Sequence, residues 1–169
     1  LGLPVLLAAR LVIHRTRLFR SRARTGGPGV PLMAVPRHAA DLAGQVIDGM
    51  RYELAATADE AFLDAANGEI IWDFSSTVSP EFQDYFYGRS FGPAIRLAEV
   101  YLILAEAQLE MDNLVESRAN LDIIRRRRGM ADAIGISKDE LMAELRGTWK
   151  VEMSREGNRF VNLVRWGTA

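Results

Sequence analysis

The sequence predicts an all-α fold of helical hairpins with one short strand and one long aromatic loop. Apolar residues recur at helical spacing in several segments, a Ser137–Glu140 pair is typical of a helix start, and only one short run is β-branched and aromatic. The chain has 169 residues, of which 49% are hydrophobic and 25% charged. A chain of this length buries roughly two thirds of its unfolded surface. We therefore expect residues 1–169 to form a single domain.

The first predicted helix covers residues 3–22, where leucines recur at near-helical spacing and arginines occupy the other side. The glycine- and proline-rich stretch 25–31 should end it, because glycine adds backbone freedom and proline removes a donor. A second helix is predicted near residues 37–48. It has one apolar face and is followed by Gly49, where a glycine cap is expected.

Residues 65–92 differ from the helical segments. The run G-E-I-I-W-D-F (68–74) predicts a short strand, and a long loop rich in aromatic residues follows it. Long connections without regular structure are uncommon and are often functional.

The helical pattern returns at Pro93, since proline is tolerated in a first helical turn. This predicted helix is apolar on most sides and must be surrounded by neighbours. Its one polar stripe comprises Arg96, Glu99, Glu106 and Glu110. We interpret this stripe as a solvated face or a structural salt bridge rather than as paired catalytic carboxylates. Asp112 and Asn113 predict a turn, and a helix from Leu114 to four arginines (125–128) follows, with basic residues at the negative end of its dipole.

Ser137 and Glu140 form a predicted capping box that opens a further helix. The segments 3–48 and 96–128 are interpreted as two helical hairpins, as in tetratricopeptide-type solenoids, although no repeat is visible in the letters. Trp149, Phe160 and Trp166 are predicted core or clasp residues, and their expected ion-paired neighbours are Glu156, Arg159 and Arg165.

Charge is uneven along the chain. Residues 1–40 hold seven arginines and no acid, leaving 14 basic and 22 acidic groups elsewhere, a net of −8. A basic segment such as residues 1–40 could be attracted to nucleic acid or to an anionic membrane. We favour the solvated side of an amphipathic helix, because the arginines alternate with apolar residues. The apolar stretch 1–13 is too short to cross a bilayer, and its charge follows rather than precedes it, unlike a secretory signal. The chain begins at Leu1, and we expect it to be a fragment of a longer protein.

Several chemistries lack the residues they need. The sequence has no cysteine, which removes disulfides, thiolate zinc sites, cysteine nucleophiles and a lipid-accepting cysteine. The two histidines, His14 and His38, are far apart and lack ligands at helical spacing. No G-x-S-x-G elbow, G-x-G-x-x-G loop or phosphate loop occurs. Four consecutive helical arginines point in different directions and form no single patch for nucleic acid.

The aromatic loop is the candidate binding site. Aromatic faces stack on sugar rings while amides, carboxylates and guanidinium groups meet hydroxyls. The predicted ligand-binding residues are Phe82, Asp84, Tyr85, Tyr87 and Arg89. The alternative is that the rings only fill the space between the strand and the helices. For Trp72 and Phe74, which lie in the strand run, packing is favoured.

Several motifs occur in the order seen in one family. Residues 96–107 read R-L-A-E-V-Y-L-I-L-A-E-A, residues 124–129 read I-R-R-R-R-G, a capped helix starts at Ser137, and residues 156–167 read E-G-N-R-F-V-N-L-V-R-W-G. Residues 40–54 and 65–72 match less strictly. The chain thus resembles the C-terminal part of the SusD/RagB family of nutrient-binding proteins. It departs from the pattern at residues 147–150 and at Asn162, where the family has charged residues, so some charge partners are lost.

The resemblance implies a surface-exposed outer-membrane lipoprotein that binds glycans or other nutrients and passes them to a SusC-like TonB-dependent transporter. It implies no catalysis, no cofactor and no nucleic acid, and a membrane contact only through a lipid anchor that this chain does not contain. Ligands are then held by loops away from the helix pairs. Two alternatives stay open: a helical-repeat scaffold for protein partners, in which Tyr85 and Tyr87 would be packed, and a hydrolase, which needs two opposed carboxylates in a cleft.

Overall fold

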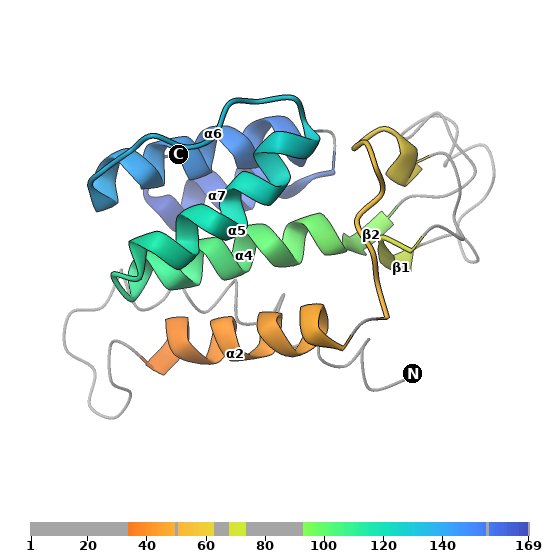
Figure 1. Ribbon diagram of the computed structural model, residues 1–169, viewed down its shortest axis with the longest axis horizontal. Coiled ribbons are helices and arrows are strands. Elements are labelled where there is room, and N and C mark those ends of the chain that lie inside the picture. The colour runs from red at the N-terminus through yellow and green to blue at the C-terminus, as the bar shows by residue number, and fades with distance from the viewer. Residues whose placement is uncertain (1–33, 50, 63–67, 74–92, 155, 169) are drawn as a thin grey trace.

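The computed structural model describes residues 34–49, 51–62, 68–73, 93–154 and 156–168 (Figure 1). The predicted helix 3–22 and the aromatic loop after residue 73 lie outside these ranges. Within them the fold is mostly helical with one small sheet, as predicted. No helix in this part of the chain is both long enough and apolar enough to cross a membrane.

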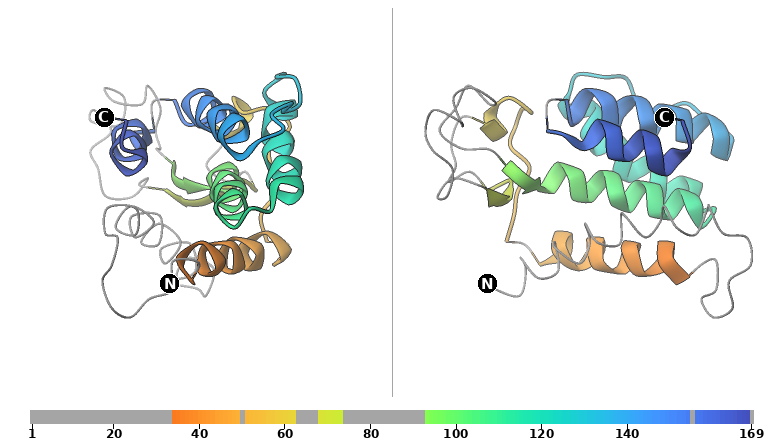
Figure 2. Two further views of the ribbon diagram at one scale, coloured as in Figure 1. Left: turned by 90° about the vertical axis from the view of Figure 1, so that its left-hand side faces the viewer. Right: turned by 180° about the vertical axis from the view of Figure 1, so that it is seen from behind.

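Two helices form the lower layers of the fold in Figure 1. Helix α2 (Ala34–Asp48) packs along helix α4 (Leu97–Glu110), and both views of Figure 2 keep them side by side. Between them in the chain come a short 3-10 helix, η1 (Glu60–Phe62), and the strands β1 (Ile70–Asp73) and β2 (Pro93–Arg96). The predicted second helix and the short strand are therefore confirmed, and the helix begins three residues earlier than predicted.

Helix α4 is the centre of the core. It contacts α2 on one side and α5 (Leu114–Arg127) and α6 (Lys138–Glu152) on the other. Its sequence L-A-E-V-Y-L-I-L-A-E-A-Q-L-E is apolar on most sides, which is typical of a helix enclosed by neighbours. Nearly all its side chains are buried, together with Leu121, Ile124, Leu141, Leu145 and Trp149 from the covering helices.

The α4–α5 hairpin has the predicted turn at Asp112 and Asn113. Asp112 adopts a left-handed backbone conformation with φ of 63°, which aspartate tolerates better than most residues. The backbone N–H of Asn113 donates to the Gln108 carbonyl at 2.9 Å, and the buried Ser117 hydroxyl donates to the Ala105 carbonyl at 2.7 Å. The first bond satisfies a carbonyl that the end of α4 leaves open, and the second joins α5 to α4.

The predicted capping box at the start of α6 is confirmed. The Glu140 backbone N–H donates to the Ser137 hydroxyl at 3.3 Å, and the Ser137 backbone N–H donates to the Glu140 carboxylate at 2.9 Å. Helix α7 (Asn158–Trp166) then lies between two glycines in the left-handed conformation, Gly157 and Gly167.

Two predictions about the C-terminal half are wrong. Residues 93–96 form a strand rather than the first turn of a helix, because they pair with β1. Phe160 is not a core residue, since its side chain is 72% exposed. Helix α7 buries Asn162, Arg165 and Trp166, which share one face at helical spacing, and Phe160 lies two positions from Asn162 on the opposite face.

Candidate functional site

The residues on either side of the aromatic loop, Asp73 and Pro93, lie next to each other in the structure. Strands β1 and β2 are antiparallel, and Asp73 at the end of β1 is paired with Pro93 at the start of β2. The backbone N–H of Leu97 donates to the Glu69 carbonyl at 2.9 Å, which extends this pairing to the first residue of α4. The two ends of the loop are thus held together at one end of α4, where the sheet lies in Figure 1.

Arg96, the last residue of β2, is fully buried and surrounded by carboxylates. Its Nη1 donates to Glu69 Oε1 and to Glu152 Oε1, both at 2.7 Å, and its Nη2 donates to Glu156 Oε1 at 2.8 Å. Its Nη2 also donates to the Glu152 carbonyl at 2.7 Å. The guanidinium lies 5.2 Å from the centre of the Phe62 ring. The donors of Arg96 are therefore shared among Glu69 before β1, Glu152 at the end of α6 and Glu156 after it, and the Phe62 ring of η1 faces the guanidinium.

Arginines from α5 complete this buried cluster. Arg127 contacts both Glu69 and Glu152, and Arg128 Nε donates to Glu152 Oε2 at 3.1 Å. Three guanidinium groups thus face the three carboxylates of Glu69, Glu152 and Glu156. A buried charge is expensive unless it is paired and hydrogen-bonded. The charge match explains how so many ionised groups are accommodated in the core.

Burial and pairing act in opposite directions on the pKa values of this cluster. Burial alone would lower the pKa of Arg96, but the hydrogen bond to Glu156 and the charges of Glu156, Glu152 and Glu69 raise it above its ordinary value. Burial raises the pKa of Glu156, and the contact with Arg96 offsets only part of that rise. Arg96 stays charged at every physiological pH and acts as a permanent anchor for the base of the loop.

A second buried cluster joins α4 to α7. Glu106 accepts from Arg165 through both carboxylate oxygens, with 2.6 Å between Arg165 Nη2 and Glu106 Oε2. Glu106 also accepts from the Trp166 indole N–H at 2.9 Å. The Arg165 guanidinium lies between two rings, 4.8 Å from the centre of Trp166 and 5.5 Å from that of Trp149. The prediction that Trp149 and Trp166 are core residues with Arg165 as an ion-paired neighbour is confirmed.

Three of the four residues in the predicted polar stripe are buried, and the fourth, Glu110, is partly exposed. Arg96, Glu99 and Glu106 are buried, which rules out the solvated face, and Arg96 and Glu106 form structural salt bridges, which was the other interpretation. The roles of Glu69, Glu152 and Arg127 could not be predicted from the sequence, because their partners lie 25 to 58 residues away. Arg125 and Arg126 bond to Ala131 and Asp132, whereas Arg127 and Arg128 both bond to Glu152, so the four arginines do not form a single patch.

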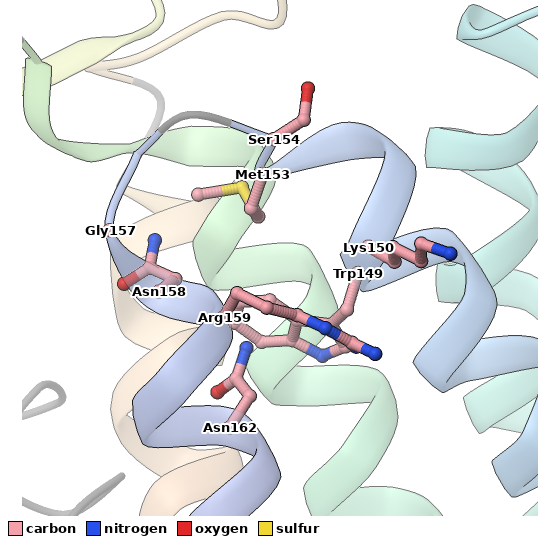
Figure 3. A pocket seen from close by; sticks show the side chains of 8 residues that line it. All are labelled: Trp149, Lys150, Met153, Ser154, Gly157, Asn158, Arg159 and Asn162. Atoms are coloured by element: carbon pink, nitrogen blue, oxygen red, sulfur yellow. The ribbon is translucent and has the colours of Figure 1, made fainter.

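A hollow of about 240 Å³ lies between the end of α6 and the start of α7 (Figure 3). Its wall contains a tryptophan, a methionine, two asparagines and two basic residues, and the full lining is Trp149, Lys150, Met153, Ser154, Gly157, Asn158, Arg159 and Asn162. No common site for Trp149, Arg159 and Asn162 was predicted from the sequence. Arg159 was predicted to be ion-paired and is instead exposed at this rim.

The five predicted ligand-binding residues, Phe82, Asp84, Tyr85, Tyr87 and Arg89, lie outside the described residues, as does Phe74. The backbone of Trp72 pairs with Ile95 in the sheet. Across the described ranges, no group of three or more histidine, aspartate or glutamate side chains is placed to hold a metal ion.

Helices packed around one buried helix, with a two-stranded sheet at its end, define a helical scaffold. Residues 39–169 match the model of the SusD family. The chain belongs to the SusD family. No curated protein gives a significant match in sequence.

Two solved structures share this fold. A SusD superfamily protein from Bacteroides vulgatus ATCC 8482 has a TM-score of 0.72 at 18% identity, over 96% of this chain and 52% of that chain. A SusD-like protein from Bacteroides fragilis NCTC 9343 has a TM-score of 0.71 at 15% identity, over 95% of this chain and 54% of that chain. The chain therefore spans about half the length of these structures.

Proposed function

We propose that the protein binds glycans or other nutrients at the outer membrane, for uptake through a SusC-like TonB-dependent transporter, and that it does not cleave them. Membership of the SusD family over residues 39–169 is the observation that carries this proposal. The residues proposed to bind the ligand are in the aromatic loop: Phe82, Asp84, Tyr85, Tyr87 and Arg89.

The geometry of the loop base supports this placement. A loop that binds a ligand must start from a rigid base, or the entropy of ordering it reduces the affinity. Here β1 and β2 hold the two ends together, and the buried Arg96, Glu69 and Glu152 fix both strands to α5 and α6. The charged groups of this base are engaged in ion pairs, so we assign recognition to the aromatic and polar side chains of the loop.

The test is a binding screen of the full-length protein against a panel of polysaccharides, by affinity gel electrophoresis and calorimetry. We expect at least one glycan to bind, and replacement of both Tyr85 and Tyr87 by alanine to weaken it. Base-to-aromatic stacking is worth roughly 1–3 kcal/mol per ring in nucleic-acid sites, and a similar loss per ring is expected for sugar stacking.

Phe160→Ala is the matched control, since Phe160 is an exposed aromatic on α7 and does not belong to the loop sequence. It should leave glycan binding unchanged. Circular dichroism of each variant should show unchanged helical content. A loss of helicity in the double tyrosine variant would instead place these rings in the core. Failure to bind any glycan, together with tight binding of a protein partner, would favour the helical scaffold for protein interactions.

A further inference from the structure

The hollow between α6 and α7 carries a positive wall. Lys150 at the end of α6 and Arg159 in the first turn of α7 both line it, and none of its eight lining residues is acidic. Both side chains are exposed, and neither forms an ion pair with any carboxylate of the described residues. By contrast, Arg165 on α7 is buried and paired with Glu106. Two uncompensated cations at one cavity favour a negatively charged occupant.

Asn162 directs a hydrogen-bond donor into this hollow. Its side chain is only 2% exposed, and its Oδ1 accepts from Arg165 Nε at 2.8 Å. Because a guanidinium can only donate, this bond fixes the orientation of the amide and turns Nδ2 the other way. Figure 3 shows that nitrogen pointing toward the space between Trp149 and Arg159. No described residue accepts from this nitrogen, and it is not one of the fully buried polar atoms that lack a partner, so it is accessible from the hollow.

The first turn of α7 adds backbone donors at the same place. Gly157 is the N-cap and has no side chain, so the opening N–H groups of the helix receive no side-chain cap. The first turn of α7 contains no acidic residue. The N-terminus of a helix carries a partial positive charge, which favours an anion. Gly157, Asn158 and Arg159 all line the hollow, so these groups border the space that Asn162 faces.

We propose that this hollow is a second binding site, separate from the aromatic loop, and that it takes an oxyanion: the carboxylate or sulfate group of a small ligand. The amide of Asn162 donates to the anion from the floor, and Lys150 and Arg159 neutralise it from the rim. A volume of about 240 Å³ is below the roughly 300–1,000 Å³ of sites for drug-sized ligands, so the ligand is small. This assignment does not depend on the proposed function.

The test is calorimetric titration of the full-length protein with sodium sulfate, sodium glucuronate and glucose at constant ionic strength. We expect sulfate and glucuronate to bind and glucose not to bind. Binding of both anions would identify the charged group as the ligand, whereas binding of glucuronate alone would assign the site to carboxylated sugars. Glucose binding as tight as glucuronate binding, or no anion binding, would overturn the proposal.

Three variants test the named residues. Asn162→Asp keeps an oxygen for Arg165 but replaces the donor by a negative oxygen, and should weaken anion binding at least about tenfold. Lys150→Gln and Arg159→Gln should each weaken it about threefold to tenfold, as expected for charge-assisted bonds at a partly open rim. Arg37→Gln, which removes an exposed arginine from α2, is the matched control and should have no effect.

Thermal unfolding without ligand should be the same for Arg159→Gln and for Arg37→Gln, which shows that any loss of binding is local. If all four variants bind sulfate with equal affinity, the anion lies elsewhere and the proposed site is wrong.

Discussion

Arg96 at the start of α4 and Glu152 at the end of α6 are 56 residues apart and form a fully buried ion pair of 2.7 Å. The pair joins the base of the aromatic loop to the covering helices. A desolvated ion pair is weak evidence for net stability, because removing charges from water opposes their attraction. Removing one partner is strongly destabilising, because the other charge then stays buried without a counter-charge.

Arg96→Met should therefore destabilise the protein by about 3–5 kcal/mol, the range for breaking a buried ion pair. Methionine keeps much of the volume, but Glu156 would lose its partner in this cluster, and Glu69 and Glu152 would keep only Arg127 and Arg128. Urea denaturation followed by circular dichroism measures the change. Arg126→Gln is the control, because Arg126 pairs with Asp132 on the surface and its loss should leave the midpoint nearly unchanged. Equal shifts for both variants would contradict a special role for Arg96.

Glu106→Gln should destabilise the packing of α7 on α4. The amide retains the shape of the side chain but not its charge, so Arg165 loses its counter-ion inside the core. Hydrogen bonds to charged groups contribute about 1.5–3 kcal/mol, and a loss in this range is expected in chemical denaturation. Trp166 donates to the same carboxylate, so its fluorescence should change as well. Glu110→Gln, on the same helix but partly exposed, should change neither observable appreciably.

Ser137→Ala should cost about 1 kcal/mol, the usual effect of removing a helix N-cap. The effect should depend on pH. The backbone N–H of Ser137, then its hydroxyl and the Ile136 N–H, donate to Glu140 and lower its pKa below the ordinary value of 4.5. A carboxyl with a lowered folded pKa contributes stability above its unfolded pKa, and that stability disappears as the pH falls through the folded value. The difference between the two proteins should shrink on acidification.

Thermal unfolding at pH 7 and at pH 3 measures this. Ser154→Ala, which removes an exposed serine after the end of α6, is the control and should have no such pH dependence. A constant difference between Ser137→Ala and the parent at both pH values would show that Glu140 does not take part in the cap.

Local signals predicted much of the fold. The apolar surface of α4, the turn at Asp112 and the cap at Ser137 depend on residues within a few positions of one another, and all three are confirmed. The partners of Arg96 could not be predicted in this way, because three chain segments must first be packed before Glu69, Glu152 and Arg96 meet. The strand at Pro93 was missed for a related reason, since four residues pair only because β1 lies beside them. The donor of Asn162 is likewise visible only once Arg165 occupies its oxygen.

Two glycines near α6 should respond oppositely to replacement by alanine. A Cβ at Gly135 would lie 2.7 Å from the Leu141 nitrogen and 2.9 Å from the Glu140 carbonyl carbon, which are backbone atoms of the first turn of α6 and cannot move aside cheaply. Gly135→Ala should destabilise by about 1–3 kcal/mol, as expected for an overpacked site. Gly147 lies inside α6, and a Cβ there meets no atom within 4 Å. Gly147→Ala should stabilise by about 0.5–1 kcal/mol, because glycine is a poor helix former. Urea unfolding of both variants measures the change in the free energy of unfolding. Destabilisation by Gly147→Ala would contradict the open space around Gly147.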